Sequence, residues 1–140
     1  MNNMPKYWKI AKKHLSNKDK VMKLLIKKYS SPSETILSTR KDIFYSLCKS
    51  IIGQQISVAA ANSVFLKFKK KCKNKITAKV VNKLSFTNLK NCGLSRQKVK
   101  GIKDLAKKTI NKSFKPSLIK KMSDEEAIEY LSELRQIGRW

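Results

Sequence analysis

The sequence predicts an all-α protein that forms a single domain over residues 1–140. Apolar residues recur at three- and four-residue intervals along most of the chain, whereas the alternation typical of β-strands is nearly absent. A hydrophobic content of 41% with only 4 Gly and 3 Pro is typical of a globular chain and not of a disordered or fibrous one. A chain of 140 residues is long enough to build one sizeable core.

The first two predicted helices are short. Trp8 and Leu15 share one face of the first helix. Ser16 is a candidate N-cap for the second helix, because Asp19 follows it at the spacing of a capping box. The serine- and proline-containing segment 30–33 is expected to end this second helix.

The most apolar segment runs from about Asp42 to Gly53. Two adjacent i, i+4 rows give this predicted helix a wide apolar stripe, so we expect it to be largely buried. Another helix should begin directly after Gly53, with Ile56 and Phe68 on one apolar row. Its lysine-rich end at residues 67–73 is expected to be a solvated tail. The two rows of the stripe are Ile43, Leu47 and Ile51, and Phe44, Cys48 and Ile52.

Two short helices are expected over residues 77–84 and around Asn88. Gly93 has the position of a helix C-terminal glycine, and Ser95 has that of the next N-cap. A longer helix follows, whose predicted apolar row consists of Val99, Ile102, Ala106 and Ile110.

The last predicted helix has the strongest local signature. Ser123 and Glu126 form an S-x-x-E capping box, and the acidic residues 124–126 suit the positive end of a helix. The helix leads into Arg135-Gln136-Ile137-Gly138-Arg139-Trp140, a glycine turn. Because no closing helix follows this turn, we expect the domain to be incomplete at its C-terminus.

The charge indicates the class of partner. Lys and Arg number 33 against 9 Asp and Glu, which gives a net charge of +24. A polyanion would relieve the resulting self-repulsion, and nucleic acid fits this role better than a membrane surface. No apolar run approaches the ~18 residues of a membrane span, and residues 1–6 contain no apolar core of a secretion signal. The sequence therefore predicts a soluble intracellular protein that binds nucleic acid.

The cysteines do not indicate a metal or disulfide framework. Cys48, Cys72 and Cys92 lie far apart in the sequence, form no C-x-x-C pair and leave one thiol over. We expect no metal site and no cofactor. The single His14 has no nucleophile paired with it in sequence and is expected at the surface.

Three segments carry more information than composition does. Ser50–Ser57 reads SIIGQQIS, Leu89–Lys98 reads LKNCGLSRQK, and Leu131–Trp140 reads LSELRQIGRW. Each alone is compatible with an ordinary helix junction, helix end or turn. In this order and at these separations they resemble the helix-hairpin-helix DNA glycosylases, and most closely the DNA-3-methyladenine glycosylase II type.

The resemblance implies an all-α helical bundle that flips a damaged base out of duplex DNA. Gln55 matches the wedge that fills the gap left by the flipped base, with Gln54 beside it. The alternative is that these glutamines only cap the following helix. Tyr7 and Trp8 are candidates for the base pocket, although core packing is an alternative role for both.

The resemblance also implies a phosphate-binding hairpin at Gln136, Ile137, Gly138, Arg139 and Trp140. The usual pattern is Gly-Ile-Gly-x-Trp, so Gln136 replaces the first glycine. The alternative to a weaker phosphate site is that the Gln136 side chain hydrogen-bonds a phosphate. Trp140 occupies the position at which strand-cutting members have a Schiff-base lysine, which implies a monofunctional enzyme.

The catalytic aspartate of the family is expected beyond Trp140. Asp19, Asp42, Asp104 and Asp124 do not match its position, so no catalytic residue is assigned within the chain. We therefore expect this chain to be inactive by itself and only marginally folded, with part of the 43–52 stripe uncovered.

The implied function is base-excision repair. The enzyme would hydrolyse the N-glycosidic bond of alkylated purines such as 3-methyladenine in double-stranded DNA, as a monomer in the cytoplasm, at the nucleoid if prokaryotic. The alternative is a non-enzymatic basic helical DNA-binding module that lacks the catalytic half. A basic RNA- or ribosome-associated protein is a weaker alternative that charge alone supports.

Overall fold

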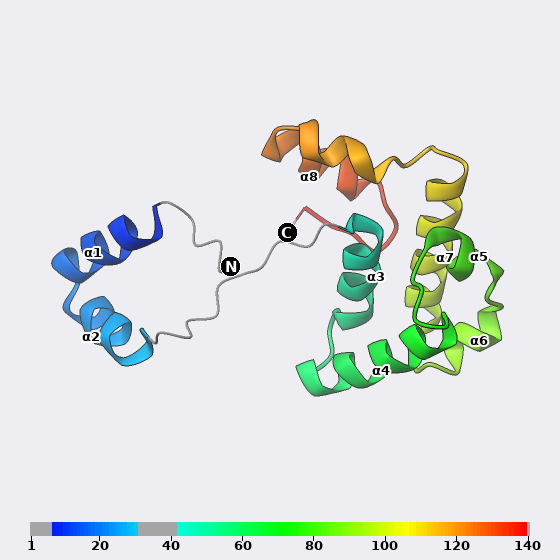
Figure 1. Ribbon diagram of the computed structural model, residues 1–140, viewed down its shortest axis with the longest axis horizontal. Coiled ribbons are helices and arrows are strands. Elements are labelled where there is room, and N and C mark those ends of the chain that lie inside the picture. The colour runs from blue at the N-terminus through cyan, green and yellow to red at the C-terminus, as the bar shows by residue number, and fades with distance from the viewer. Residues whose placement is uncertain (1–6, 31–41, 140) are drawn as a thin grey trace. The chain divides into compact units, whose positions relative to one another are not determined.

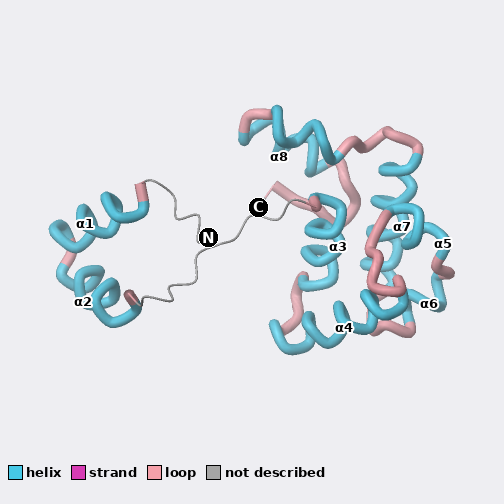
Figure 2. The backbone as a smooth tube through the Cα atoms, in the orientation of Figure 1, coloured by secondary structure: helices cyan, strands magenta, loops and turns pink. Residues whose placement is uncertain are grey.

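The computed structural model describes residues 7–30 and 42–139, and every regular element within these ranges is a helix (Figures 1 and 2). The all-α prediction is confirmed. The chain divides into two compact units, residues 1–40 and 41–140. Among the described helices, none combines the length and the apolar character that a membrane crossing requires.

The first unit is a pair of helices, α1 (Trp8–Lys18) and α2 (Lys20–Tyr29). Asp19 lies between them, and its carboxylate accepts a hydrogen bond from the backbone N–H of Met22 at 2.8 Å. The prediction that Ser16 caps α2 is wrong. Ser16 lies inside α1, whereas Asp19 leaves the helical conformation (φ −138°, ψ 121°) and can cap the next helix.

The second unit starts with α3 (Ile43–Gly53), whose N-cap is Asp42. Most of its apolar stripe is covered, because Cys48, Ile51 and Ile52 have no exposed surface and Phe44 is buried as well. Helix α3 is contacted by α4 (Val58–Lys71), α7 (Arg96–Ile110) and the 3-10 helix η1 (Pro116–Lys121). Ile43 and Leu47 are half-buried, so the expectation of a partly uncovered stripe holds for these two residues only.

Helix α4 (Val58–Lys71) begins at the N-cap Ser57, so Ile56 lies outside the helix and is exposed. The predicted row is wrong at Ile56 and right at Phe68, which is buried. The buried face is formed by Phe65, Phe68 and Cys72. The lysine-rich end is helical up to Lys71, and its two apolar residues reach the core while its lysines remain at the surface.

The next elements are α5 (Ala78–Lys83), α6 (Phe86–Lys90) and α7 (Arg96–Ile110). Gly93 has φ +97°, as expected of a glycine after a helix. A Cβ at Gly93 would lie 3.2 Å from Val64 Cγ2, so glycine also allows this turn to approach α4. Ser95 caps α7, as the sequence predicts. The predicted row is wrong at its end, because Ile110 is 41% exposed and Leu105 is buried in its place.

Helix α8 (Asp124–Ser132) has the predicted capping box between Ser123 and Glu126. Its Tyr130 ring stacks on Phe114 with centroids 5.3 Å apart. The Tyr130 hydroxyl also accepts a hydrogen bond from the backbone N–H of Lys115 at 2.7 Å. These contacts hold α8 to the segment that follows α7.

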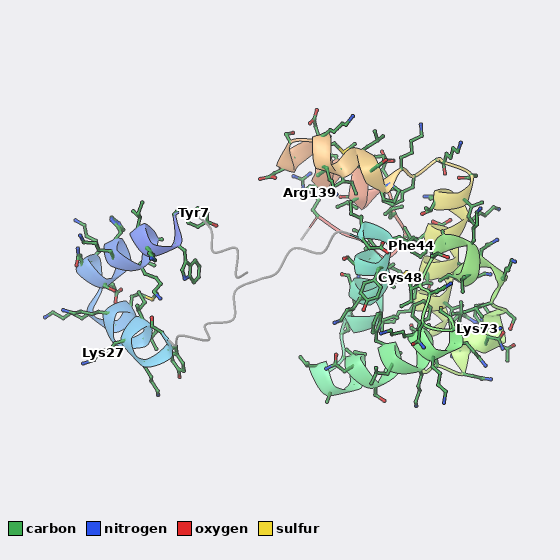
Figure 3. All side chains as sticks on the ribbon, in the orientation of Figure 1. Tyr7, Lys27, Phe44, Cys48, Lys73 and Arg139 are labelled. Carbon is green, nitrogen blue, oxygen red and sulfur yellow. The ribbon has the colours of Figure 1, made fainter. Side chains whose placement is uncertain are left out.

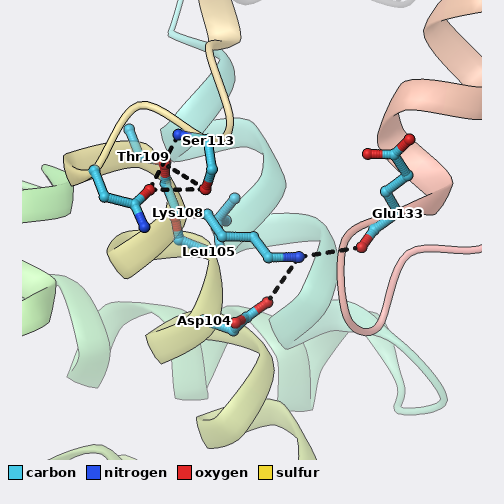
Figure 4. Close-up of polar contacts among 7 residues, drawn as sticks. Asp104, Leu105, Lys108, Thr109, Ser113 and Glu133 are labelled. Atoms are coloured by element: carbon cyan, nitrogen blue, oxygen red, sulfur yellow. Dashed lines mark hydrogen bonds and ion pairs between the residues drawn. The ribbon is translucent and has the colours of Figure 1, made fainter.

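Lysines on α7 stabilise the ends of other elements. Lys103 Nζ donates to the backbone oxygens of Asn82 (2.6 Å) and Leu84 (2.9 Å) at the end of α5. Lys108 Nζ donates to Glu133 O at 3.3 Å, just after α8, and lies 3.5 Å from the Asp104 carboxylate (Figure 4). Carbonyls at a helix end have no partner within the helix, so these ammonium groups satisfy them.

Candidate functional site

In the second unit, the segment with the predicted wedge (residues 50–57) contacts the segment with the predicted hairpin (residues 131–140). Gln54, the residue after α3, donates a hydrogen bond from its side-chain Nε2 to the backbone oxygen of Gln136 at 2.6 Å. The two residues are 82 positions apart in the sequence. The sequence assigned them to separate motifs, and the structure brings these motifs into direct contact.

Gln55 lies at the surface of the turn between α3 and α4. Its φ of +55° is in the left-handed region, which is unfavourable for a residue with a side chain. Such a conformation persists when its surroundings impose it. The predicted wedge residue is thus an exposed side chain on a turn that the neighbouring elements hold in place.

Lys98 holds this turn from α7. Its Nζ donates to the backbone oxygens of Ile52 at 2.8 Å and Gln54 at 2.7 Å. Both oxygens belong to the end of α3, where helical partners are lacking. Desolvation lowers the pKa of the Lys98 ammonium. No role was predicted for Lys98 from the sequence, although it is the last residue of the LKNCGLSRQK segment.

The hairpin turn follows α8 directly. The backbone N–H of Ile137 donates to Leu134 O at 3.1 Å, and Gln136 has φ +71°. This left-handed conformation is the one that a glycine adopts without strain, and the family pattern has a glycine at this position. Gln136 therefore keeps the backbone shape of the expected glycine.

Gly101 on α7 lets the hairpin turn approach closely. A Cβ at Gly101 would lie 2.7 Å from Gln136 Cγ and 3.4 Å from the Arg135 oxygen. The first distance is too short for two carbon atoms, so only glycine fits here without a shift of the turn. Helix α7 therefore supports both turns, through Lys98 on one and Gly101 on the other.

The remaining hairpin residues have different surroundings. Gly138 and Arg139 are exposed, and the Arg139 guanidinium forms an ion pair with the Glu125 carboxylate of α8. Trp140 lies outside the described residues. The prediction that residues 136–140 bind phosphate stays a prediction.

Several carboxylates already have structural partners. Asp19 and Asp42 accept backbone hydrogen bonds as N-caps, and Asp104 pairs with Lys108. Glu126 accepts hydrogen bonds from Ser123, which lower the pKa of its carboxyl group. Within residues 7–30 and 42–139, no group of three or more His, Cys, Asp or Glu side chains could hold a metal ion.

The three thiols are buried and free. Desolvation raises the pKa of Cys72 to about 11, and it raises the pKa values of Cys48 and Cys92 as well. A thiol acts as a nucleophile in its thiolate form, so none of these side chains is poised for covalent catalysis.

Tyr7 and Trp8 belong to the first unit, so they share no element with the two turns. Tyr7 is exposed. Trp8 lines an apolar groove of about 260 Å³ together with Leu15, Met22 and other residues of α1 and α2. Its buried Nε1 has no hydrogen-bond partner within the described part of the chain. The base-pocket role of both residues stays a prediction.

Comparison with known proteins identifies relatives of this chain. A family model described as HhH-GPD superfamily base excision DNA repair protein matches residues 48–137. DNA-3-methyladenine glycosylase 1 of Schizosaccharomyces pombe is 29% identical over 133 residues, which are 93% of this chain and 58% of that protein. Alkylbase DNA glycosidase-like protein mag2 of the same yeast is 32% identical over 137 residues, or 95% and 64% of the two chains. The chain thus spans less than two thirds of either relative.

Solved structures agree with the fold. The S. pombe 3-methyladenine DNA glycosylase Mag1, in complex with abasic DNA, matches with a TM-score of 0.82 and 29% identity, covering 93% of this chain and 65% of that one. A DNA-3-methyladenine glycosidase from Bacillus halodurans matches with a TM-score of 0.73 at 19% identity, covering 99% and 60%, and so supports the fold alone. The family match includes α4 to α8, the turn between α3 and α4 and the first two residues of the hairpin turn, and it shows that the chain belongs to the HhH-GPD superfamily of base excision DNA repair proteins.

Proposed function

We propose that this chain provides the DNA-engaging part of a monofunctional DNA glycosylase that hydrolyses the N-glycosidic bond of alkylated purines. The observation that carries the proposal is the hydrogen bond from Gln54 to Gln136. This bond joins the turn between α3 and α4 (residues 54–57, the wedge turn) to the hairpin turn that follows α8. The names of the two yeast relatives support alkylated bases, 3-methyladenine among them, as the substrate class. The proposed enzyme is a monomer, acts on double-stranded DNA in the cytoplasm and needs no cofactor.

In this proposal one turn fills the gap left by the extruded base, and the other turn binds the DNA backbone. Extrusion of a base from the duplex costs a few kcal/mol of unstacking. Gln55 fills the gap that the base leaves, since a planar amide can both stack and hydrogen-bond to the unpaired base opposite. The hairpin turn binds a nearby phosphate through backbone N–H groups.

The chemical step needs a carboxylate that stabilises the sugar cation and helps water attack C1′. In this proposal the aspartate follows Trp140, and the partners of Asp42 and Asp104 support the view that these two residues are structural. Trp140 in the place of a Schiff-base lysine supports hydrolysis by water rather than strand cleavage. We therefore expect the 140-residue chain to bind and unstack DNA without releasing a base.

A fluorescent base separates these activities. The chain is added to a duplex that contains one 2-aminopurine, whose emission rises when it leaves the stack, and to duplex DNA that contains 3-methyladenine. We expect the emission to rise, and base release to stay at the spontaneous rate. Gln55→Ala should remove most of the rise, while Gln97→Ala at an exposed position of α7 should not.

Each outcome has a clear meaning. Binding without any rise in emission would contradict the wedge assignment and favour a DNA-binding module that does not flip bases. Release of 3-methyladenine by these 140 residues would overturn the placement of the catalytic carboxylate beyond Trp140.

A further inference from the structure

Four lysine side chains line one surface hollow at the far end of α4 from the wedge turn. This lysine hollow has a volume of about 460 Å³ and is lined by Lys67, Lys70, Lys71 and Lys73 together with Asn91 and Cys92. The four lysines come from the end of α4 and the residues after it, and Asn91 and Cys92 come from the turn after α6. Figure 3 labels Lys73 beyond the end of α4.

The four ammonium groups have no acidic partner among the described residues. Within residues 7–30 and 42–139, no ion pair or hydrogen bond involves any of these lysine side chains, and no carboxylate lines the hollow. Lys67 and Lys71 come near enough to the Cys92 thiol to oppose the rise in its pKa that burial causes. Like charges therefore converge on this hollow without compensation, and an anion would remove their repulsion.

A second basic hollow of similar size differs in this respect. It has a volume of about 450 Å³ and contains Lys100, Lys103 and Lys107 with Arg135, but Asp104 also lines it. The Lys103 ammonium is already bound to two backbone oxygens. Uncompensated positive charge therefore distinguishes the lysine hollow from a basic surface in general.

The position of the lysine hollow suits a long polyanion. Helix α4 has 14 residues and begins just after the wedge turn, so its far end lies roughly 20 Å along the helix axis from that turn. Successive phosphates of one DNA strand are about 3.4 Å apart along the duplex, which makes this separation about six base pairs. A duplex held at Gln55 is long enough to reach the hollow.

We propose that the lysine hollow is a second phosphate-binding surface, which takes the backbone of duplex DNA flanking the wedge turn. The choice of a duplex as the occupant rests on the proposed function. The surface contacts no base, so it binds damaged and undamaged DNA alike. It strengthens binding and lengthens the footprint without taking part in base extrusion.

The test compares two quadruple variants with the same loss of charge. In the hollow variant, all four lysines of the hollow become Gln. In the control variant, four exposed lysines elsewhere in the second unit become Gln. Each change lowers the net charge by four, and all eight side chains are exposed, so both variants should fold. The control positions are Lys112, Lys115, Lys120 and Lys121.

The readout is the salt dependence of binding to an undamaged 20-base-pair duplex. Each phosphate contact contributes about −0.9 to the slope of log K against log salt, so loss of two to four contacts should make the slope shallower by about 2 to 4. We expect this change in the hollow variant and a much smaller one in the control. The 2-aminopurine signal at saturating protein should be unchanged in the hollow variant, whereas Gln55→Ala should lose that signal and keep the slope.

Three results would overturn the proposal. Equal changes of slope in both variants would show that overall charge matters and the hollow does not. Loss of inorganic pyrophosphate binding in the hollow variant, with duplex affinity and salt slope unchanged, would indicate a site for a small anion. Tighter binding of single-stranded RNA than of duplex DNA, lost in the hollow variant alone, would assign the surface to RNA. None of these measurements requires base release, so failure of the glycosylase assignment would be seen separately.

Discussion

Replacement of Lys98 by Met should loosen the wedge turn, because Met keeps the length of the side chain and removes its ammonium group. Two backbone oxygens, those of Ile52 and Gln54, would lose their donor. An unsatisfied buried acceptor costs about 1–3 kcal/mol, and partial access of water at this half-buried site lowers the cost, so we expect about 2–3 kcal/mol in total. For a unit of about 100 residues this corresponds to a fall in Tm of roughly 10–20 °C.

Lys103→Met is the matched control, because Lys103 lies on the same helix and donates to two carbonyls at the end of α5. Thermal unfolding followed by circular dichroism should show similar destabilisation of both variants. At a temperature where both are folded, only Lys98→Met should reduce the 2-aminopurine signal, and Lys98→Arg should restore part of it. Equal loss of signal in Lys98→Met and Lys103→Met would refute the view that Lys98 positions the wedge turn, since general destabilisation would then explain both.

Three further predictions concern the hairpin turn, a buried thiol and the overall charge. Gly101→Ala should lower the free energy of unfolding by about 1–3 kcal/mol, because the new Cβ crowds Gln136. Adding Gln136→Gly to the same chain should recover most of this loss, as measured by urea denaturation of the single and double variants. If the double variant recovers nothing, crowding against Gln136 is not the cause. Because the pKa of Cys72 is raised from 9.0 to about 11, the stabilisation that its neutral thiol contributes is complete below pH 9 and is lost as the pH rises toward 11. Tm should therefore fall between pH 9 and pH 11. If Tm falls just as steeply with pH in Cys72→Ala, the Cys72 thiol is not the cause. Binding to duplex DNA should weaken steeply between 50 and 200 mM salt, and an affinity that stays flat in filter binding would exclude phosphate contacts as its main source.

Local signals in the sequence were sufficient to predict most helix boundaries. The predicted N-caps at Ser95 and Ser123 depend on a side chain that bonds to a backbone group three residues away, so they can be read from short segments. The wrong prediction of an N-cap at Ser16 also rested on a short-range capping signal. Both Ser16 and Asp19 are capping residues, and only the place where α1 ends decides between them.

Contacts between distant segments could not be predicted in this way. The register of α4 depends on the core formed with α3 and the turn at Gly93, and the lysine-rich segment gave no sign that Cys72 is buried. The motif strings named Gln54 and Gln136 but gave no reason for them to touch. Lys98 was overlooked because one lysine among many carries no signal until its ammonium is seen between two carbonyl oxygens.

The lysines of α7 have a consequence for how the molecule responds to salt. The carboxyl end of a helix carries partial negative charge, and Lys98 and Lys103 lie at such ends of α3 and α5. These short, partly buried contacts are screened far less than exposed charges, while the mutual repulsion of a +24 surface is screened strongly. Added salt should therefore leave the folded state intact or strengthen it under the same conditions that release it from DNA. Elution from a polyanionic matrix at high ionic strength would then yield native protein.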